Sequence, residues 1–322
     1  MHIIAYSVSS FEIEYLESAN RMKHEMSLKA MPLSLESVGL AKGAEAVIIF
    51  TSDDASEPVI NALADLGIKY IVTRSSGTDH IDLKAAEKRG IKVANVPSYS
   101  PQAIAEQAVM LALALSRKLI DTMHLVQEYN FTIEKHVGFN FYGKTVGLIG
   151  LGSIGKAAAA IFIGLGCRVL AFDVDQEIEM DQVERVSLDA LLDQSDIISL
   201  HAPLNESTRH MINRETMSKM KNGVMLINTS RGALINTEDL IAKLEEGKIG
   251  YLGLDVYEFE KGIFFGDHSM DPIKDSLLQK LINHKNVIIT PHQGFLTREA
   301  LKEIAQICMS NIDAWQKGSD LN

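Results

Sequence analysis

The stretch Thr145-Val-Gly-Leu-Ile-Gly-Leu-Gly-Ser-Ile-Gly155 decides the fold of this 322-residue chain. A β-branched apolar run ends at Gly150, and Gly152 and Gly155 complete a G-x-G-x-x-G spacing before an Ala-rich helical segment. Glycine is required there because a Cβ would block the tight turn, the approach of a pyrophosphate and the packing of helix on strand. The N-terminus of the helix then favours an anion. The pattern predicts a dinucleotide-binding βαβ unit.

The next apolar run, residues 168–172, ends at Asp173, about 20 residues after the first glycine, which is the spacing expected of such a unit. A carboxylate there accepts hydrogen bonds from both ribose hydroxyls and repels a 2′-phosphate, so we expect NAD(H) rather than NADP(H). The alternative is an ordinary glycine-rich turn followed by a surface aspartate. The residues predicted to bind NAD here are Gly150, Gly152, Ser153, Ile154, Gly155 and Asp173.

Strand patterns alternate with helical patterns along the whole chain, which implies parallel strands joined by right-handed crossovers. The first series of predicted strands is 2–6, 46–50, 70–73 and 92–96, and the second is 145–149, 168–172, 196–200, 224–228, 251–256 and 286–290. Helical patterns at 153–165 and 237–246 belong to the second series, which predicts a sheet of about six strands. The predicted fold class is α/β, with two doubly wound parallel-sheet domains: a Rossmann-type NAD domain and a smaller, flavodoxin-like substrate domain.

A long helix marks the joint between these domains. Ser100 is a good N-cap and Pro101 suits the first helical position, and the helical pattern runs to about Lys118. Its stretch 109–115 is apolar all round, so one side should contact the next domain or another subunit. A last amphipathic helix, Thr297 to about Lys317, is expected to return to the first unit. We therefore expect a substrate domain at 1–99 plus 296–322, a dinucleotide-binding domain at 100–295, and a homodimer or higher oligomer.

Composition limits the possible functions. Hydrophobic residues make up 46% and charged residues 23%, as in soluble globular proteins, and 31 Lys+Arg against 42 Asp+Glu give a net charge of −11. That charge disfavours nucleic acid and anionic membranes as partners. Cys167 and Cys308 are far apart, without Cys-x-x-Cys spacing, so we expect neither disulfides nor a metal site. With no secretory signal and no apolar run near the roughly 18 residues of a membrane span, we expect a cytoplasmic protein.

Three motifs near the C-terminus carry a resemblance to a known family. They are Asn228-Thr-Ser-Arg-Gly-Ala-Leu-Ile-Asn-Thr237, Gly253-Leu-Asp-Val-Tyr-Glu-Phe-Glu260 and Ile289-Thr-Pro-His-Gln-Gly-Phe295, and they resemble signatures of the D-2-hydroxyacid dehydrogenases. Within that family, the segments Tyr99-Ser-Pro101, Arg74-Ser-Ser-Gly-Thr-Asp-His-Ile-Asp82 and Gly262-Ile-Phe-Phe-Gly-Asp-His-Ser269 are most similar to the fermentative D-lactate dehydrogenase branch. The likeness is weakest in the first 45 or so residues and between Asp121 and Phe141.

The resemblance implies three catalytic residues. Arg231 would bind the substrate carboxylate and polarise its carbonyl, because a guanidinium presents a planar fork of donors. His292 would exchange the proton with the substrate oxygen, and Glu260 would fix the imidazole tautomer and stabilise the imidazolium. Glu258 lies in the same Tyr-Glu-Phe-Glu run, and Glu260 is chosen for its offset from Asp255. Each residue also has a non-catalytic interpretation when it is considered alone. Arg231 would be a surface salt-bridge partner, Glu260 a solvated carboxylate and His292 a histidine that satisfies hydrogen bonds in a turn.

Further residues follow from the same resemblance. Backbone N–H groups of the loop Ser75, Ser76 and Gly77 would meet the carboxylate, and Tyr99 and Phe295 would face the substrate side chain. Further NAD contacts would be Ala202, Pro203, Thr208, Thr229, Ser230 and Asp255. His201 is expected to satisfy local hydrogen bonds only. Arg74, just outside the substrate loop, is the candidate cation for a second substrate carboxylate.

The function expected from these residues is NADH-dependent reduction of pyruvate to D-lactate, a reversible hydride transfer to a 2-oxo acid. One alternative is a dehydrogenase for a bulkier 2-oxo acid such as 2-oxoisocaproate. The other is an NAD(H)-sensing, corepressor-like binding protein, because one fold hosts several functions.

Overall fold

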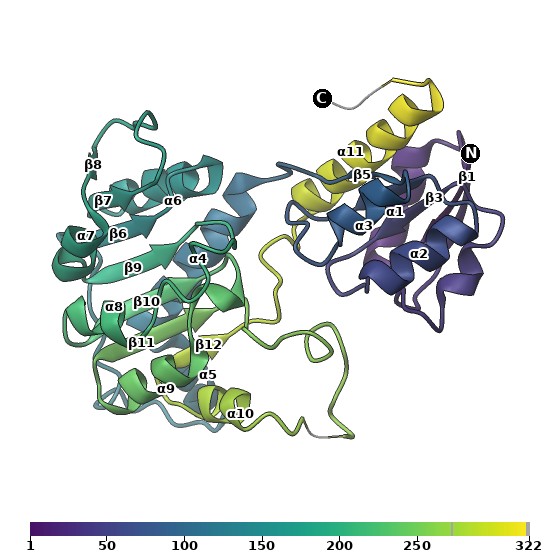
Figure 1. The fold of residues 1–322 in the computed structure, drawn as a ribbon. Coiled ribbons are helices and arrows are strands. Elements are labelled where there is room, and N and C mark those ends of the chain that lie inside the picture. The colour runs from purple at the N-terminus through teal and green to yellow at the C-terminus, as the bar shows by residue number, and fades with distance from the viewer. Residues whose placement is uncertain (272, 320–322) are drawn as a thin grey trace. The chain divides into compact units, whose positions relative to one another are not determined.

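The computed structural model describes residues 1–271 and 273–319 and divides the chain into two compact units. Unit 1 comprises residues 1–100 together with the described residues from 296 onward, and unit 2 comprises residues 101–295 (Figure 1). Each unit is a parallel sheet with helices on both faces, so the expected fold class is confirmed. Among the described residues, no helix has both the length and the apolar character needed to cross a bilayer.

Unit 2 is built on a seven-stranded sheet in the order β12-β11-β10-β9-β6-β7-β8. Its strands are β6 (Thr145–Ile149), β7 (Arg168–Phe172), β8 (Val183–Arg185), β9 (Ile197–Leu200), β10 (Val224–Asn228), β11 (Ile249–Leu254) and β12 (Val287–Ile289). The strand order reverses between β6 and β9, and open α/β sheets bind ligands at such a switch point. The predicted count of about six strands missed β8, a short edge strand whose Val-Glu-Arg sequence has no apolar run to reveal it.

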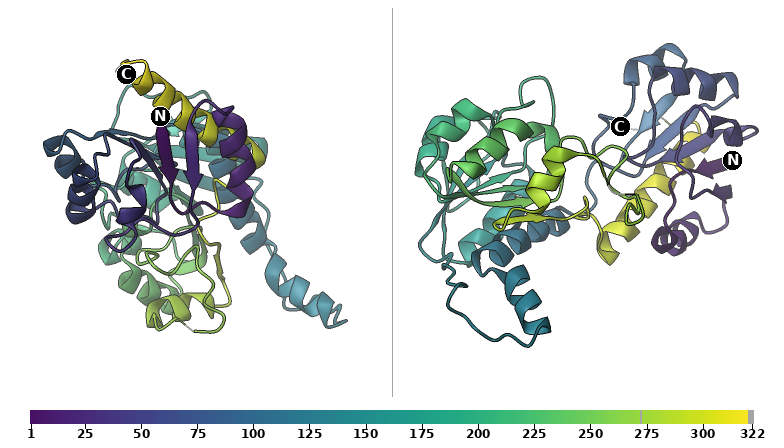
Figure 2. Two further views of the ribbon diagram at one scale, coloured as in Figure 1. Left: turned by 90° about the vertical axis from the view of Figure 1, so that its right-hand side faces the viewer. Right: turned by 90° about the horizontal axis from the view of Figure 1, so that it is seen from below.

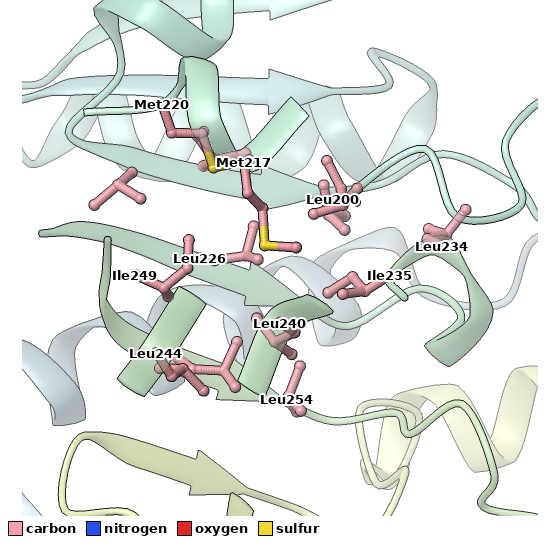
Figure 3. Packing of buried hydrophobic residues seen from close by; sticks show 14 of the residues in the cluster. Leu200, Met217, Met220, Leu226, Leu234, Ile235, Leu240, Leu244, Ile249 and Leu254 are labelled. Carbon is pink, nitrogen blue, oxygen red and sulfur yellow. The ribbon is translucent and has the colours of Figure 1, made fainter. Parts of the chain in front are cut away.

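Helices cover both faces of this sheet. On one face lie α4 (Pro101–Ser116) and α6 (Ser153–Gly164), and on the other α7 (Leu188–Gln194), α8 (Arg214–Lys219), α9 (Thr237–Glu245) and α10 (Ser276–Ile282). Figure 3 shows the core on the second face, where Met217 of α8 and Leu240 of α9 pack with strand residues such as Leu226. Burial of these side chains, each worth about 1.5–3 kcal/mol, fixes the helices against the sheet.

The helix at the domain joint is shorter than its sequence pattern predicted. It ends at Ser116, and Lys118 adopts a left-handed backbone conformation with φ of 51° before α5 (Leu119–Gln127) begins. The apolar α4 packs against α6, β10 and β11, whereas α5 has no buried residue. Figure 2 shows α5 projecting from the body of unit 2.

Unit 1 carries a five-stranded parallel sheet in the order β2-β1-β3-β4-β5. Its strands are β1 (His2–Ala5), β2 (Glu25–Leu28), β3 (Ala46–Ile49), β4 (Tyr70–Thr73) and β5 (Lys92–Ala94). One face is covered by α1 (Ser10–Asn20) and α11 (Arg298–Gln316), and the other by η1 (Val38–Ala41), α2 (Glu57–Asp65) and α3 (Leu83–Lys88). The last helix is anchored by Trp315, which stacks on Tyr70 with ring centroids 4.8 Å apart. Strand β2 was not predicted, because Glu-Met-Ser-Leu has no β-branched residue.

Candidate active site

The glycine turn lies after β6 and has the close approaches that only glycine permits. Gly150 has φ of +101°, and a Cβ there would lie 2.7 Å from the carbonyl group of His201. A Cβ on Gly155 would lie 2.2 Å from the Gly150 oxygen, whereas nothing lies within 4 Å of one placed on Gly152. The turn is therefore packed against β9 on its inner side and open before the first residues of α6, Ser153 and Ile154. This shape fits a pyrophosphate at a helix N-terminus.

Asp173, which follows β7, is hydrogen-bonded to the glycine turn. Its Oδ2 accepts a hydrogen bond from the Leu151 N–H at 2.7 Å, and its Oδ1 accepts one from the Asp175 N–H at 2.9 Å. An ionised carboxylate has about four acceptor positions, so two remain for ribose hydroxyls. The turn and its carboxylate together fit an NAD molecule.

The loops after β9 and β10 complete this side of unit 2. Ser230 Oγ donates to the Ala202 oxygen at 2.6 Å, and Thr208 Oγ1 donates to the Pro203 oxygen at 2.7 Å. Thr229 Oγ1 is buried and has no hydrogen-bond partner within the described part of the chain. All five residues lie in the segments that follow β9 and β10, and their contacts with NAD stay a prediction.

His201 lies behind the glycine turn and behaves as a neutral structural residue. Burial lowers the pKa of its imidazole to about 4, and its Nε2 is 3.0 Å from Ser199 Oγ. The expectation of local hydrogen bonds is met at one ring nitrogen only, because Nδ1 is buried without a partner among the described residues. That His201 takes no part in catalysis stays a prediction.

His292 and Glu260 form a direct pair. His292 Nδ1 is 2.7 Å from Glu260 Oε1, while Glu260 Oε2 accepts the Tyr257 N–H at 2.9 Å. Because a carboxylate only accepts, the Nδ1–H donates to it and the Nε2 atom is left for proton exchange. The side chains are 18% and 25% exposed, so the pair is sheltered yet open to a ligand. Of the two glutamates considered, Glu260 contacts this histidine; Glu258 pairs with a different one.

Asp255 is buried beneath the His292 turn. It is 1% exposed, and its oxygens accept hydrogen bonds from Thr290 Oγ1, the Gln293 N–H and the Gly294 N–H. Burial raises the pKa of the Asp255 carboxyl, and these hydrogen bonds oppose the rise. The carboxylate is thus turned into the protein, where it holds a turn in which His292 has φ of +54°. Its predicted proximity to the nicotinamide stays a prediction.

Sequence reasoning missed three residues around this turn. Gln107 of α4 donates through Nε2 to Thr290 Oγ1 at 2.9 Å and to Asp255 Oδ1 at 3.2 Å. The Phe265 ring lies 5.9 Å from the imidazole of His292. The available signals were an amide on the otherwise apolar inner side of α4 and the Gly262–Ser269 segment that carries Phe265.

Arg231 follows β10, Glu260 follows β11 and His292 follows β12, so the three lie beyond the carboxyl ends of adjacent parallel strands. The carbonyl oxygen of Arg231 accepts a hydrogen bond from Asn228 Nδ2 at 2.8 Å. The next residue, Gly232, is so close to the Tyr257–Glu258 backbone that a Cβ would lie 2.1 Å from Tyr257 C. The arginine is therefore held next to the segment that carries Glu260.

Phe295, predicted to face the substrate side chain, is 9% exposed and ends unit 2 directly after this turn. Tyr99, the other aromatic side chain of that prediction, belongs to unit 1 and is partly exposed.

In unit 1, the loop Ser75–Gly77 follows β4. Ser75 is buried and its Oγ donates to the Gly77 oxygen at 2.8 Å, while Asn95 Nδ2 donates to the Ser76 oxygen at 2.6 Å. Within residues 1–271 and 273–319, neither the Ser76 N–H nor the Gly77 N–H donates a hydrogen bond. These side-chain contacts fix the loop and leave two donors for an anion.

Arg74 points away from this loop. It is 2% exposed, its Nε lies 3.0 Å from Glu12 Oε1, and its terminal nitrogens donate to the carbonyl oxygens of Tyr6 and Ser7. The candidate cation for a second substrate carboxylate is thus already engaged inside unit 1.

These features are typical of a nicotinamide-dependent dehydrogenase. The glycine turn lies at the switch point, and an arginine and a histidine–carboxylate pair lie beyond the ends of adjacent strands. Residues 109–294 match the family model described as "D-isomer specific 2-hydroxyacid dehydrogenase, NAD binding domain", and the chain belongs to this family of NAD-dependent enzymes. No cluster of three histidine, cysteine or carboxylate side chains suited to a metal ion occurs among the residues that the structure describes.

Named relatives cover nearly the whole chain. It is 44% identical to D-lactate dehydrogenase kk1H of Curvularia clavata, over 99% of this chain and 93% of that one. It is 42% identical to the D-lactate dehydrogenase of Escherichia coli strain K12, over 99% and 98%. A solved pyruvate reductase of Chlamydomonas reinhardtii superposes with a TM-score of 0.93 at 39% identity, over 100% of this chain and 98% of that one.

Proposed function

We propose that this enzyme reduces pyruvate to D-lactate with NADH, and catalyses the reverse reaction with NAD. The observation that carries the proposal is the His292–Glu260 pair, with Nδ1 and Oε1 2.7 Å apart. Glu260 follows β11 and His292 follows β12, next to β10, which precedes Arg231, in the strand order β12-β11-β10. When bound, NADH supplies the hydride for the substrate carbon. The residues of the chain supply a proton, a fixed orientation and a counter-charge. The relatives named as D-lactate dehydrogenases and a pyruvate reductase support the choice of substrate.

His292 acts as the acid and base. With Nδ1 bonded to Glu260, the proton passes from Nε2 to the carbonyl oxygen in reduction, and returns to Nε2 from the hydroxyl in oxidation. Glu260 accepts the Nδ1–H of His292 and keeps the ring in one orientation. The Tyr257 N–H holds Glu260 in turn.

Arg231 binds the substrate carboxylate through paired hydrogen bonds and polarises the neighbouring carbonyl. The Ser76 and Gly77 N–H groups, in the loop that begins at Ser75, provide further donors to the same carboxylate. Tyr99 and Phe295 face the group attached to the carbonyl carbon.

A small apolar substrate side chain fits this arrangement better than a second carboxylate. Burying an uncompensated carboxylate costs several kcal/mol. Arg74 does not offer compensation, because its guanidinium is bonded to Glu12, Tyr6 and Ser7. We expect kcat/KM for pyruvate to exceed that for 2-oxoglutarate by at least about tenfold, equivalent to about 1.4 kcal/mol.

The test is a panel of pyruvate, oxaloacetate, 2-oxoglutarate and 2-oxoisocaproate with NADH and NADPH, followed at 340 nm, with the chirality of the product determined. Efficient reduction of pyruvate by NADH to the D-isomer is the expected result. A higher kcat/KM for 2-oxoisocaproate would reassign the substrate to the bulkier alternative. NADH binding without turnover of any 2-oxo acid would favour the sensing protein instead.

The enzyme is further proposed to be a cytoplasmic homodimer or higher oligomer. Unpaired, buried Cys167 and Cys308 suit a reducing compartment. The segment from α5 to residue 137 exposes many large apolar side chains, which a second copy would cover: Leu119, Ile120, Met123, Val126, Tyr129, Phe131, Ile133 and Val137. Light scattering at micromolar concentrations should give at least twice 35.5 kDa. A monomer mass would reject the oligomer.

A further inference from the structure

Unit 2 contains a second histidine–glutamate pair that the proposed chemistry does not use. His210 Nε2 lies 2.5 Å from Glu258 Oε1, and Glu258 Oε2 accepts the Thr237 N–H at 3.0 Å. The Glu258 side chain is only 6% exposed, whereas that of His210 is 32% exposed. Burying a carboxylate costs free energy, and the ion pair that it forms in a buried position adds little net stability. The two residues of the pair lie on either side of the turn that follows Arg231.

The turn that follows Arg231 lies between two segments. On one side, the His210 N–H donates to the Ala233 oxygen at 2.9 Å and the Ile212 N–H donates to the Leu234 oxygen at 3.0 Å. Leu234, the last residue of this turn, and Ile235 belong to the core shown in Figure 3.

On the other side, Gly232 packs directly on the Tyr257–Glu258 backbone, with no room for a Cβ. The His210–Glu258 pair joins these two sides, so it closes a ring of contacts around the backbone that carries Arg231.

The same ring reaches the acid–base pair. Glu260 is two residues beyond Glu258, and its Oε2 accepts the N–H of Tyr257, the residue packed on Gly232. A shift of the Tyr257–Glu258 backbone would therefore move Glu260 relative to Arg231. Catalysis depends steeply on such spacing, since a misplacement of about 1 Å can cost about a hundredfold in rate.

We propose that His210 and Glu258 are positioning residues, whose ion pair sets the spacing between the Arg231 guanidinium and the His292–Glu260 pair. The inference rests on the proposed function, because it takes Arg231 to bind the substrate carboxylate. The ion pair lies on the oxo-acid side of the proposed site. Loss of the pair should therefore weaken binding and turnover of the oxo acid far more than binding of NADH.

The decisive variant is His210→Asn. Asparagine tolerates the positive φ of 51° at this position, but its side chain is too short to reach Glu258. We expect kcat/KM for pyruvate to fall at least tenfold, and the Kd of oxamate, an unreactive 2-oxo acid analogue, to rise at least fivefold in the presence of NADH. The Kd of NADH should change less than twofold.

Two further variants interpret this result. Glu258→Gln keeps an oxygen for the Thr237 N–H and an amide that can bond a neutral imidazole, so it should retain more activity than His210→Asn. The matched control is Arg214→Gln, which breaks the ion pair between Arg214 Nε of α8 and Asp239 Oδ1 of α9, 3.1 Å long, and leaves the contacts of His210, Gly232 and Glu258 in place. Its kcat/KM and oxamate Kd should stay within twofold of wild type.

The outcomes separate clearly. Folded His210→Asn protein with unchanged kcat/KM and oxamate Kd would overturn the positioning role, and so would a parallel loss of NADH affinity. If His210→Asn does not fold, Glu258→Gln decides by the same two constants, with a rise in oxamate Kd above the control expected. A wild-type protein that reduces no 2-oxo acid would instead refute the proposed function itself.

Discussion

Replacing Asp255 by asparagine tests whether the buried carboxylate holds the His292 turn. The substitution keeps the size of the side chain and exchanges one acceptor oxygen for an NH2 group. In the wild-type structure Oδ1 accepts hydrogen bonds from Thr290 Oγ1, the Gln293 N–H and Gln107 Nε2. Oδ2 accepts one from the Gly294 N–H at 2.8 Å. Whichever way the amide is turned, an NH2 group faces at least one backbone N–H.

The magnitude follows from that count. A buried N–H left without an acceptor costs about 1–3 kcal/mol. Removing a charge whose burial is unfavourable returns part of this, which is the cause of the raised pKa of Asp255. We expect a net loss of about 2 kcal/mol, which lowers Tm by about 4–8 °C for a domain of the size of unit 2. Because the loosened turn carries His292, kcat/KM for the oxo acid should fall at least about tenfold, or 1.4 kcal/mol.

The assay pairs calorimetric melting with steady-state kinetics well below the Tm. The control is Asp196→Asn, since Asp196 also accepts a backbone N–H, that of Thr145 at 2.9 Å, but precedes β9 at the opposite edge of the sheet. It should lower Tm with little change in kcat. If Asp255→Asn lowers Tm as the control does and leaves kcat/KM intact, the carboxylate is only structural and our reasoning about the turn is wrong.

Three other predictions test separate parts of the molecule. Arg231→Lys keeps the charge but not the paired hydrogen bonds, so kcat/KM should drop at least about a hundredfold, or 2.7 kcal/mol; near-normal turnover would remove Arg231 from the site. Asp173→Ala should narrow the kcat/KM preference for NADH over NADPH, and it should also weaken NADH binding because the Leu151 N–H loses its acceptor. An unchanged preference would shift the ribose contact to another group, with Asp175 the first candidate. Burial raises the pKa of the Cys167 thiol to about 11 and that of the Cys308 thiol to about 12. Neither thiol should therefore react with a thiol reagent at pH 8 in the folded protein, and both should react after unfolding. Rapid labelling of the folded protein would contradict this.

Local sequence patterns predicted the parts of the site whose geometry is set within a few residues. The spacing of Gly150, Gly152 and Gly155 is typical of a tight turn, and the close backbone contacts at Gly150 and Gly155 are ones that only glycine permits. Strand runs of four or five β-branched and apolar residues were likewise readable. Strands β2 and β8 were not, since pairing with an adjacent strand, and not their own composition, makes them extended.

The tertiary structure decided which polar side chains meet. Glu258 and Glu260 are nearly equivalent in sequence, yet one pairs with a histidine 48 residues away and the other with a histidine 32 residues away. Arg74 is adjacent to the predicted substrate loop, but it turns inward because Glu12 and two carbonyl oxygens complete its hydrogen bonds inside unit 1. Such choices depend on which strand ends become neighbours and which partner removes a buried charge from isolation, and neither is a property of residues close together along the chain.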